Sequence, residues 1–273
     1  MALADWAAFR EAVADPHWSW LWRKTPASGI VGGADLMLYS GISVGPYSVA
    51  DPSTSVALDN TSGISIAHPA VAGRSIVTSF QVFNSSTNLL DRFALSGLLI
   101  DRLVHQGGLV GNVITLQTTN LPTAALTRHT SGVGVMIGLD FYTVVSPAPT
   151  TITVVYTNQS GAGGRSGYVV ASAFLGNDLF LPVSLQAGDT GVRSVESVQF
   201  SNAFGGAGNV GVVLFKPLAL LVGRGAGDDS VMTVLGWNTG WETDACLQVL
   251  PYAASMSGTG LDDPTMLIHT ADV

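Results

Sequence analysis

Residues 150–172 read TTITVVYTNQSGAGGRSGYVVAS, two β-prone runs on either side of a glycine cluster. A phosphate-binding loop would need a helix directly after the glycines, because the free N–H groups of the helix N-terminus hold the phosphate. Here the chain continues as YVVA, which is β-prone, and the cluster lacks the Gly-Lys-Ser/Thr ending of a P-loop. The stretch therefore predicts a β-hairpin with a glycine-rich corner.

The same punctuated β pattern covers most of the chain. Thirty-two glycines and twelve prolines separate the apolar runs, and helical periodicity is nearly absent between residues 30 and 225. Many short strands with turn residues at about ten-residue spacing are typical of a sandwich or barrel. The predicted fold class is all-β, a jelly-roll-like antiparallel β-sandwich. The candidate strands are 36–44, 75–83, 97–105, 133–145, 151–157, 167–174, 192–200 and 209–222.

One candidate strand, VRSVESVQF at 192–200, departs from simple alternation. Its valines stand at 192, 195 and 198, a spacing of three residues. A regular strand repeats every two residues, so this run predicts a β-bulge or an edge position.

The first 26 residues differ from the rest of the chain. Trp6, Phe9 and Val13 recur at helical spacing, so residues 3–14 predict a short amphipathic helix, which Asp15-Pro16 ends. In the WSWLWR run that follows, the tryptophans alternate with other residues, which puts three indoles on one face of an extended segment. The predicted organisation is a helix and tryptophan-rich arm at 1–26 and a β-sandwich domain at 27–273. A subdivision near residue 120, with LPTAAL at 121–126 as linker, stays open.

The aromatic side chains of this arm have two interpretations. They pack on the body of the same chain, or the arm docks on a neighbouring subunit, since chain termini can reach across and aromatic residues dominate interface hot spots. The arm's basic residues would suit an acidic neighbour. The candidate partner-binding residues are Trp6, Phe9, Arg10, Trp18, Trp20, Trp22, Arg23 and Lys24.

Composition restricts the class of protein. Only 11% of residues are charged, against about 25% in ordinary soluble domains. We therefore expect a surface of uncharged polar residues, or one covered by neighbouring subunits. A net charge of −8 with two lysines argues against direct nucleic-acid binding, which needs a basic surface.

The sequence also argues against secretion and membrane insertion. The longest apolar run, PLALLV at 217–222, falls far short of the ~20 residues that a bilayer crossing needs. The amino terminus has acidic residues and no apolar signal region. A single cysteine, Cys246, excludes an internal disulfide, and we expect synthesis in the cytoplasm.

No motif predicts an active site, a metal site or a cofactor. The five histidines form no H-x-x-x-H pair, and G-x-S-x-G is missing. Asp101 and His105 would share a face of a strand, though about 13 Å apart along it, and a structural or surface role is favoured for every histidine. The acidic doublets at 228–229 and 262–263 leave calcium binding open. Trp237 and Trp241 could stack on a sugar, but a core or interface role is favoured.

Four stretches within residues 121–222 are similar to sequences of a known class of proteins. The succession LPTAALTRHTSGVGVMIGLDFYT, TITVVYTNQSGAGGR, LQAGDTGVRSVESVQFS and GNVGVVLFKPL resembles structural proteins encoded in the virion modules of tailed bacteriophages. These are β-rich proteins of head or tail. The resemblance covers about 100 of the 273 residues and implies assembly in the host cytoplasm and packing of many copies side by side.

Together these observations predict a non-enzymatic virion protein, foremost a decoration or cement protein on the head. Residues 1–26 would grip the capsid lattice or a sister subunit, so the expected partners are the major capsid protein or other virion proteins, with self-association. The alternatives are a tail or neck component, or a carbohydrate- or receptor-binding β domain that uses Trp237, Trp241 or Tyr252.

Overall fold

The computed structural model describes residues 18–23, 54–61, 75–83, 95–121, 126–143, 149–171, 179–222, 230–238, 240–253 and 265–272. The chain divides into two compact units, each made of segments that are distant in sequence. Unit 1 comprises residues 1–45, 60–101 and 218–273, and unit 2 comprises residues 46–59 and 102–217. The described residues form strands and turns, with no α-helix among them. The predicted all-β class is therefore confirmed.

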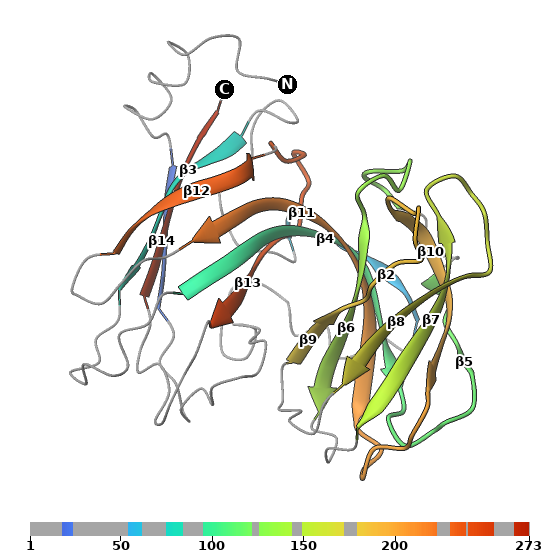
Figure 1. The fold of residues 1–273 in the computed structure, drawn as a ribbon. Coiled ribbons are helices and arrows are strands. Elements are labelled where there is room, and N and C mark those ends of the chain that lie inside the picture. Colours follow the sequence, from blue (N-terminus) through green and yellow to red (C-terminus); the bar gives the residue numbers. More distant parts are fainter. Residues whose placement is uncertain are drawn as a thin grey trace. The chain divides into compact units, whose positions relative to one another are not determined.

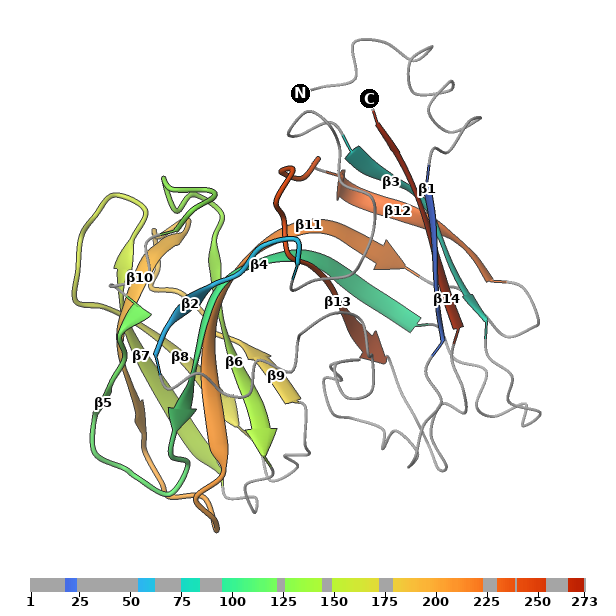
Figure 2. The same cartoon turned by 180° about the vertical axis from the view of Figure 1, so that it is seen from behind.

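Unit 2 is sandwich-like, with two antiparallel sheets that lie face to face (Figures 1 and 2). One sheet has the strand order β2-β4-β11-β6-β9, and the other has the order β5-β10-β7-β8. The long strands β4 (Leu95–Leu109) and β11 (Asn209–Val222) contribute residues to both units. The remaining strands of unit 2 are β2 (Val56–Ala57), β5 (Gln117–Thr118), β6 (Met136–Thr143), β7 (Thr150–Asn158), β8 (Arg165–Ala171), β9 (Leu179–Pro182) and β10 (Val192–Phe200).

An apolar core fills the space between these two sheets. β7 alternates between buried and more exposed residues along its whole length, so that one face packs inward. Phe204, in the turn between β10 and β11, contacts Phe200 of one sheet and Phe141 of the other edge to face, with ring centroids 5.5 and 6.0 Å away. All three rings are buried. Phe204 therefore joins the two sheets near one end of the sandwich.

The pairing of β10 with β7 explains why the valines of β10 are three residues apart. Its register with β7 shifts twice, between Val192 and Ser194 and between Val195 and Ser197. Each shift adds one residue to β10, so residues three apart point to the same side. Val192, Val195 and Val198 are all fully buried as a result. The predicted bulge is confirmed, and β10 lies inside its sheet, between β5 and β7, instead of at an edge.

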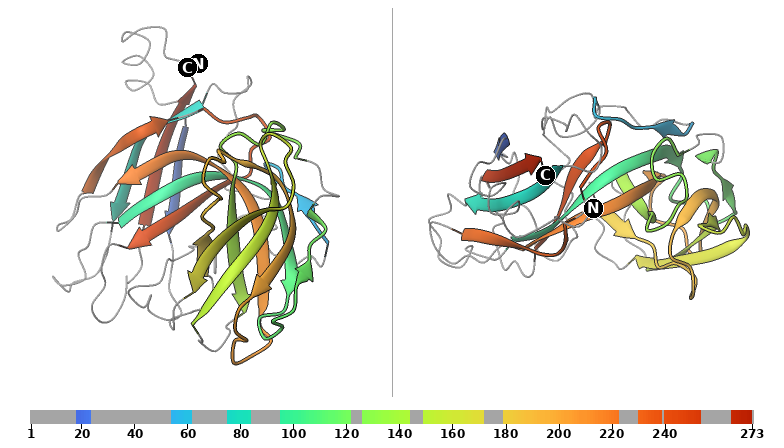
Figure 3. Two further views of the ribbon diagram at one scale, coloured as in Figure 1. Left: turned by 45° about the vertical axis from the view of Figure 1, so that its right-hand side comes forward. Right: turned by 90° about the horizontal axis from the view of Figure 1, so that it is seen from above.

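Unit 1 contains one sheet with the order β1-β14-β3-β12-β11-β4-β13. The strand β1 lies beside β14 at the edge of this sheet, blue beside red in Figure 3. Near its other edge, the Asp101 carboxylate accepts a hydrogen bond from the backbone N–H of Cys246 at 2.9 Å. The strands that belong to unit 1 alone are β1 (Trp18–Arg23), β3 (Ser75–Phe83), β12 (Ser230–Asn238), β13 (Leu247–Ala253) and β14 (Thr265–Asp272).

Most of the predicted strands are present. The runs 75–83, 192–200 and 209–222 coincide with β3, β10 and β11, and four others overlap β4, β6, β7 and β8. The hairpin predicted at 150–172 is confirmed as β7 and β8, paired from Thr150–Ala171 to Tyr156–Arg165. The candidate strand 36–44 and the predicted helix 3–14 lie outside the described residues. The six strands that sequence reasoning missed are β2, β5, β9, β12, β13 and β14.

Candidate interaction surface

The corner between β7 and β8 is built by Asn158 and glycine. The Asn158 side-chain oxygen accepts hydrogen bonds from the backbone N–H groups of Ser160 and Ala162, both at 3.0 Å, and from the Ser160 hydroxyl at 2.7 Å. Gly161 and Gly164 have φ values of 86° and 68°, a left-handed conformation that favours glycine. The glycine cluster therefore serves the turn itself.

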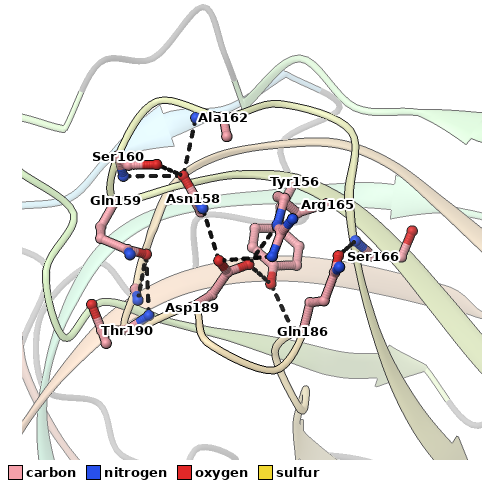
Figure 4. Close-up of polar contacts among 11 residues, drawn as sticks. Tyr156, Asn158, Gln159, Ser160, Ala162, Arg165, Ser166, Gln186, Asp189 and Thr190 are labelled. Carbon is pink, nitrogen blue, oxygen red and sulfur yellow. Dashed lines mark hydrogen bonds and ion pairs between the residues drawn. The ribbon is translucent and has the colours of Figure 1, made fainter.

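Asp189, in the turn before β10, is the centre of a polar cluster that ties this corner to the β9–β10 connection (Figure 4). Arg165 donates two hydrogen bonds to its carboxylate, at 2.9 and 3.1 Å. The Tyr156 hydroxyl donates a third at 2.7 Å, and the Asn158 amide donates a fourth at 2.8 Å. Each carboxylate oxygen thus accepts two hydrogen bonds, and the Asp189 side chain is 3% exposed.

The pKa shifts in this cluster follow from the same contacts. Hydrogen bonds from Arg165 and then from Tyr156 lower the pKa of Asp189 to about 2. Burial, and then the hydrogen bond to Asp189, raise the pKa of Tyr156 to about 12. Shifted pKa values often mark functional sites, but ion-pair networks also produce them. Because every lone pair of Asp189 that faces the protein is occupied, we interpret the cluster as a clamp between two loops.

A second polar cluster lies in the interior of unit 2. Arg102 of β4 and Asp140 of β6 form an ion pair at 2.9 Å, with side chains 0% and 1% exposed. The Arg102 guanidinium also hydrogen-bonds the Nδ1 atom of His105 at 3.0 Å. Burial, and then the Arg102 charge, lower the pKa of His105 to about 3, so this histidine is neutral at pH 7. The structural role predicted for His105 agrees with this enclosed position.

The outer face of the four-stranded sheet of unit 2 is exposed or half-buried except at Ser197, which is buried, and it carries no charge over most of its area. Three rows of opposed residues cross it: Thr118–Ser197–Val155–Ser166, Gln199–Thr153–Tyr168 and Thr151–Val170. We call these nine residues the uncharged outer face. Tyr168 and Val170 are 59% and 62% exposed. Glu196 lies beyond these rows on β10 and accepts hydrogen bonds from Thr157 and Ser194.

This face agrees with what the low charge content predicts, a surface of uncharged polar residues. Seven of its nine residues are Ser, Thr, Gln or Tyr, and the other two are valines. Sequence reasoning did not single out any of the nine as an interaction residue. The available signal was the T-x-T-x-V alternation of β7 opposite S-x-Y-x-V of β8, both next to the predicted corner.

The structure places only part of the predicted partner-binding set. Trp18, Trp20, Trp22 and Arg23 lie on β1, an extended segment as predicted, and pair with Thr270, Ile268, Met266 and Thr265 of β14 in the same chain. Their side chains, and Trp6, Phe9, Arg10 and Lys24 as a whole, lie outside the described part of the chain. Docking of this arm on a neighbour stays a prediction.

The other candidates have mixed outcomes. Trp241 is 1% exposed, so it belongs to the core, and the idea that it stacks on a sugar is wrong. The side chains of Trp237 and Tyr252 and both acidic doublets lie outside the described residues. Within those residues, no group of three or more His, Cys, Asp or Glu could hold a metal ion, and no helix has the length and apolar character needed to cross a membrane.

No protein-family model, curated protein or solved structure matches the chain.

Proposed function

We propose that this chain is a non-enzymatic structural protein of a tailed-phage virion, and that its unit 2 is a jelly roll. The strand order of unit 2 carries the proposal. Taken in chain order from β4 to β11, its eight strands form one sheet of the first, eighth, third and sixth strands, and one of the second, seventh, fourth and fifth. That is the order of two interlocked Greek keys, an architecture that recurs in viral capsid domains and lectins.

The polar clusters support a structural duty. Asp189 and Arg165 hold the β7–β8 corner against the β9–β10 connection, and Arg102 and Asp140 join β4 to β6 inside the sandwich. Both clusters use charged side chains to fix the framework of unit 2. A protein that works by packing many copies needs such a rigid framework, because its contacts must repeat identically in every copy.

The low charge content of the chain suits packing at close quarters. Two copies of a chain with net charge −8 repel each other wherever their acidic groups approach. Because only 11% of its residues are charged, the chain has surface where a neighbour approaches without that cost and without leaving an ion unpaired. We favour a decoration or cement protein of the head, with the arm at residues 1–26 binding the major capsid protein or a sister subunit.

The test is quantitative mass spectrometry of purified virions, with the major capsid protein as the internal standard. A cement protein is expected at a ratio near one to the capsid protein, or near one per capsomer. A small copy number would assign the chain to the neck or tail instead. Its absence from the particle would overturn the proposal.

A further inference from the structure

The middle row of the uncharged outer face brings an aromatic ring, a hydroxyl and an amide into one line. Tyr168 of β8 lies directly opposite Thr153 of β7, and Thr153 lies directly opposite Gln199 of β10. Neighbouring strands are about 4.8 Å apart, so the row extends about 10 Å across the sheet. Thr151 and Val170 continue the surface on one side of it, and Val155 and Ser166 on the other.

Tyr168 is held in a fixed position although its ring is exposed. Its backbone N–H and C=O both bond Ser184, at 3.1 Å each, while the strand pairs with β7 on its other side. The preceding residue, Gly167, allows this close approach, since a Cβ there would lie 2.7 Å from the Ser184 carbonyl oxygen. A large aromatic side chain exposed on a strand that is bonded on both sides is preorganised for a ligand.

Most polar side-chain groups in this row and next to it are not used by the protein. Among the described residues, the hydroxyls of Thr153, Ser166 and Tyr168 make no hydrogen bond, and Gln199 uses only its amide N–H, which donates to the Ile114 carbonyl at 3.2 Å. The Asp189 cluster on the same sheet is the opposite case, since its donors and acceptors are saturated. These donors and acceptors are therefore free to bond a ligand that lies beside the exposed ring.

The chemistry of the row selects the class of ligand. It contains no Lys or Arg to bind phosphate, sulfate or carboxylate groups, and no Asp or Glu to bind a cation. An apolar partner would leave the hydroxyls and the amide desolvated without hydrogen bonds. A neutral sugar has both properties that the row requires, a C–H face that packs on an aromatic ring and hydroxyls that donate and accept hydrogen bonds. We propose that the row Gln199–Thr153–Tyr168 binds a neutral, extended oligosaccharide, with Tyr168 as the stacking platform.

The experiment uses the full chain and an array of neutral linear gluco-, xylo-, manno- and galacto-oligosaccharides, followed by calorimetric titration of the strongest binder. Tyr168→Ala is expected to weaken binding about tenfold or more, which corresponds to about 1.4 kcal/mol. Tyr168→Phe keeps the ring and is expected to retain most of the affinity. Gln199→Ala removes the unused amide oxygen and is expected to weaken binding by a smaller factor.

Val133→Ala is the matched control. Val133 is an apolar residue with similar exposure, 53%, and it bridges Gly191, which lies about 20 Å along the sheet from Gln199 once the two bulges of β10 are allowed for. Its substitution should leave binding unchanged. Circular dichroism of each variant separates loss of binding from loss of folding.

Three results would overturn the proposal. The first is no binding to any neutral oligosaccharide at millimolar concentration. The second is binding that Tyr168→Ala leaves intact, because the ligand would then lie elsewhere. The third is a dimer in analytical ultracentrifugation that Tyr168→Ala dissociates, because the occupant of the face would then be a second copy of the chain. None of these results depends on whether the chain is found in virions.

Discussion

The buried ion pair of Arg102 and Asp140 offers a sharp test of how unit 2 is held together. Both side chains are removed from solvent, and their charged atoms are 2.9 Å apart. Truncating one partner leaves the other charge buried without compensation, which costs about 3–5 kcal/mol. Replacing both by apolar residues of similar size is often neutral or even stabilising. We therefore expect Asp140→Leu and Arg102→Met to destabilise unit 2 strongly and the double variant to be close to the wild type.

The assay is urea unfolding of all four proteins, followed by far-ultraviolet circular dichroism. All six tryptophans lie outside unit 2, so tryptophan fluorescence reports on unit 1. With a urea slope of about 1–3 kcal/mol per molar, a loss of 3 kcal/mol lowers the midpoint by about 1–3 M. The circular-dichroism transition should shift in both single variants, and the fluorescence transition should shift less.

The double-mutant cycle isolates the pair itself. If each single variant loses about 3–5 kcal/mol and the double variant stays near the wild type, the coupling energy of the pair is about 6–10 kcal/mol, well above that of ordinary neighbouring residues. Two outcomes would refute the reasoning. One is a coupling energy below about 1 kcal/mol, which would mean that other groups stabilise each charge. The other is a double variant less stable than either single variant, which would show that the side chains matter through their packing instead of their charge.

Three further predictions concern other parts of the molecule. The pKa of His105 is about 3 in the folded protein and 6.5 when unfolded, so acid favours the unfolded chain and stability should fall by about 1.4 kcal/mol per pH unit below pH 6.5. Urea unfolding of His105→Gln should lack this slope down to about pH 4, below which a second slope begins because Asp189 takes up a proton with its ordinary pKa of 3.8 in the unfolded chain and only near pH 2 in the folded protein. In Gly138→Ala the new Cβ would lie 2.0 Å from the Phe180 ring, so the free energy of unfolding should fall by about 1–3 kcal/mol in thermal unfolding. Adding Phe180→Leu should restore part of this stability. An unchanged melting temperature in Gly138→Ala would contradict this packing. Deletion of residues 2–17 spares β1 and its pairing with β14, so the chain should fold normally by circular dichroism yet fail to join particles. Incorporation at normal copy number would refute docking through Trp6, Phe9 and Arg10.

Local pattern was sufficient for the strands that bury one face. Residues 150–158 alternate in the sequence and alternate in burial along β7, and the glycine corner directly after them fixes the hairpin with β8. The short strands escaped detection because β2 and β5 have only two residues each, too few for any periodicity. At β6 the predicted strand began too early, because Gly132 and Gly134 adopt left-handed conformations and turn the chain before Met136.

The local sequence pattern could not predict which distant segments pair with each other. In unit 2, β2 pairs with β4, and β5 pairs with β10 about eighty residues further along the chain. These pairings follow from burial of the whole apolar surface, which no single window of sequence expresses. The buried position of Arg102 belongs to the same class, since its partner Asp140 comes from another strand and arginine is almost never fully buried unless it is paired.

In the row proposed to bind sugar, one residue pairing can be predicted from the sequence and the other cannot. The opposition of Tyr168 and Thr153 follows from a hairpin whose corner can be read directly from the glycines. The opposition of Thr153 and Gln199 depends on the two register shifts of β10. Because side chains alternate between faces, each shift moves every later residue of the strand to the other face. Two shifts together restore the original alternation, so Gln199 shares its face with Thr153 while Val198 points into the core. The valine spacing predicts that a bulge exists, but only the paired structure shows that there are two. Their number decides whether an amide or a valine completes the row of Thr153 and Tyr168.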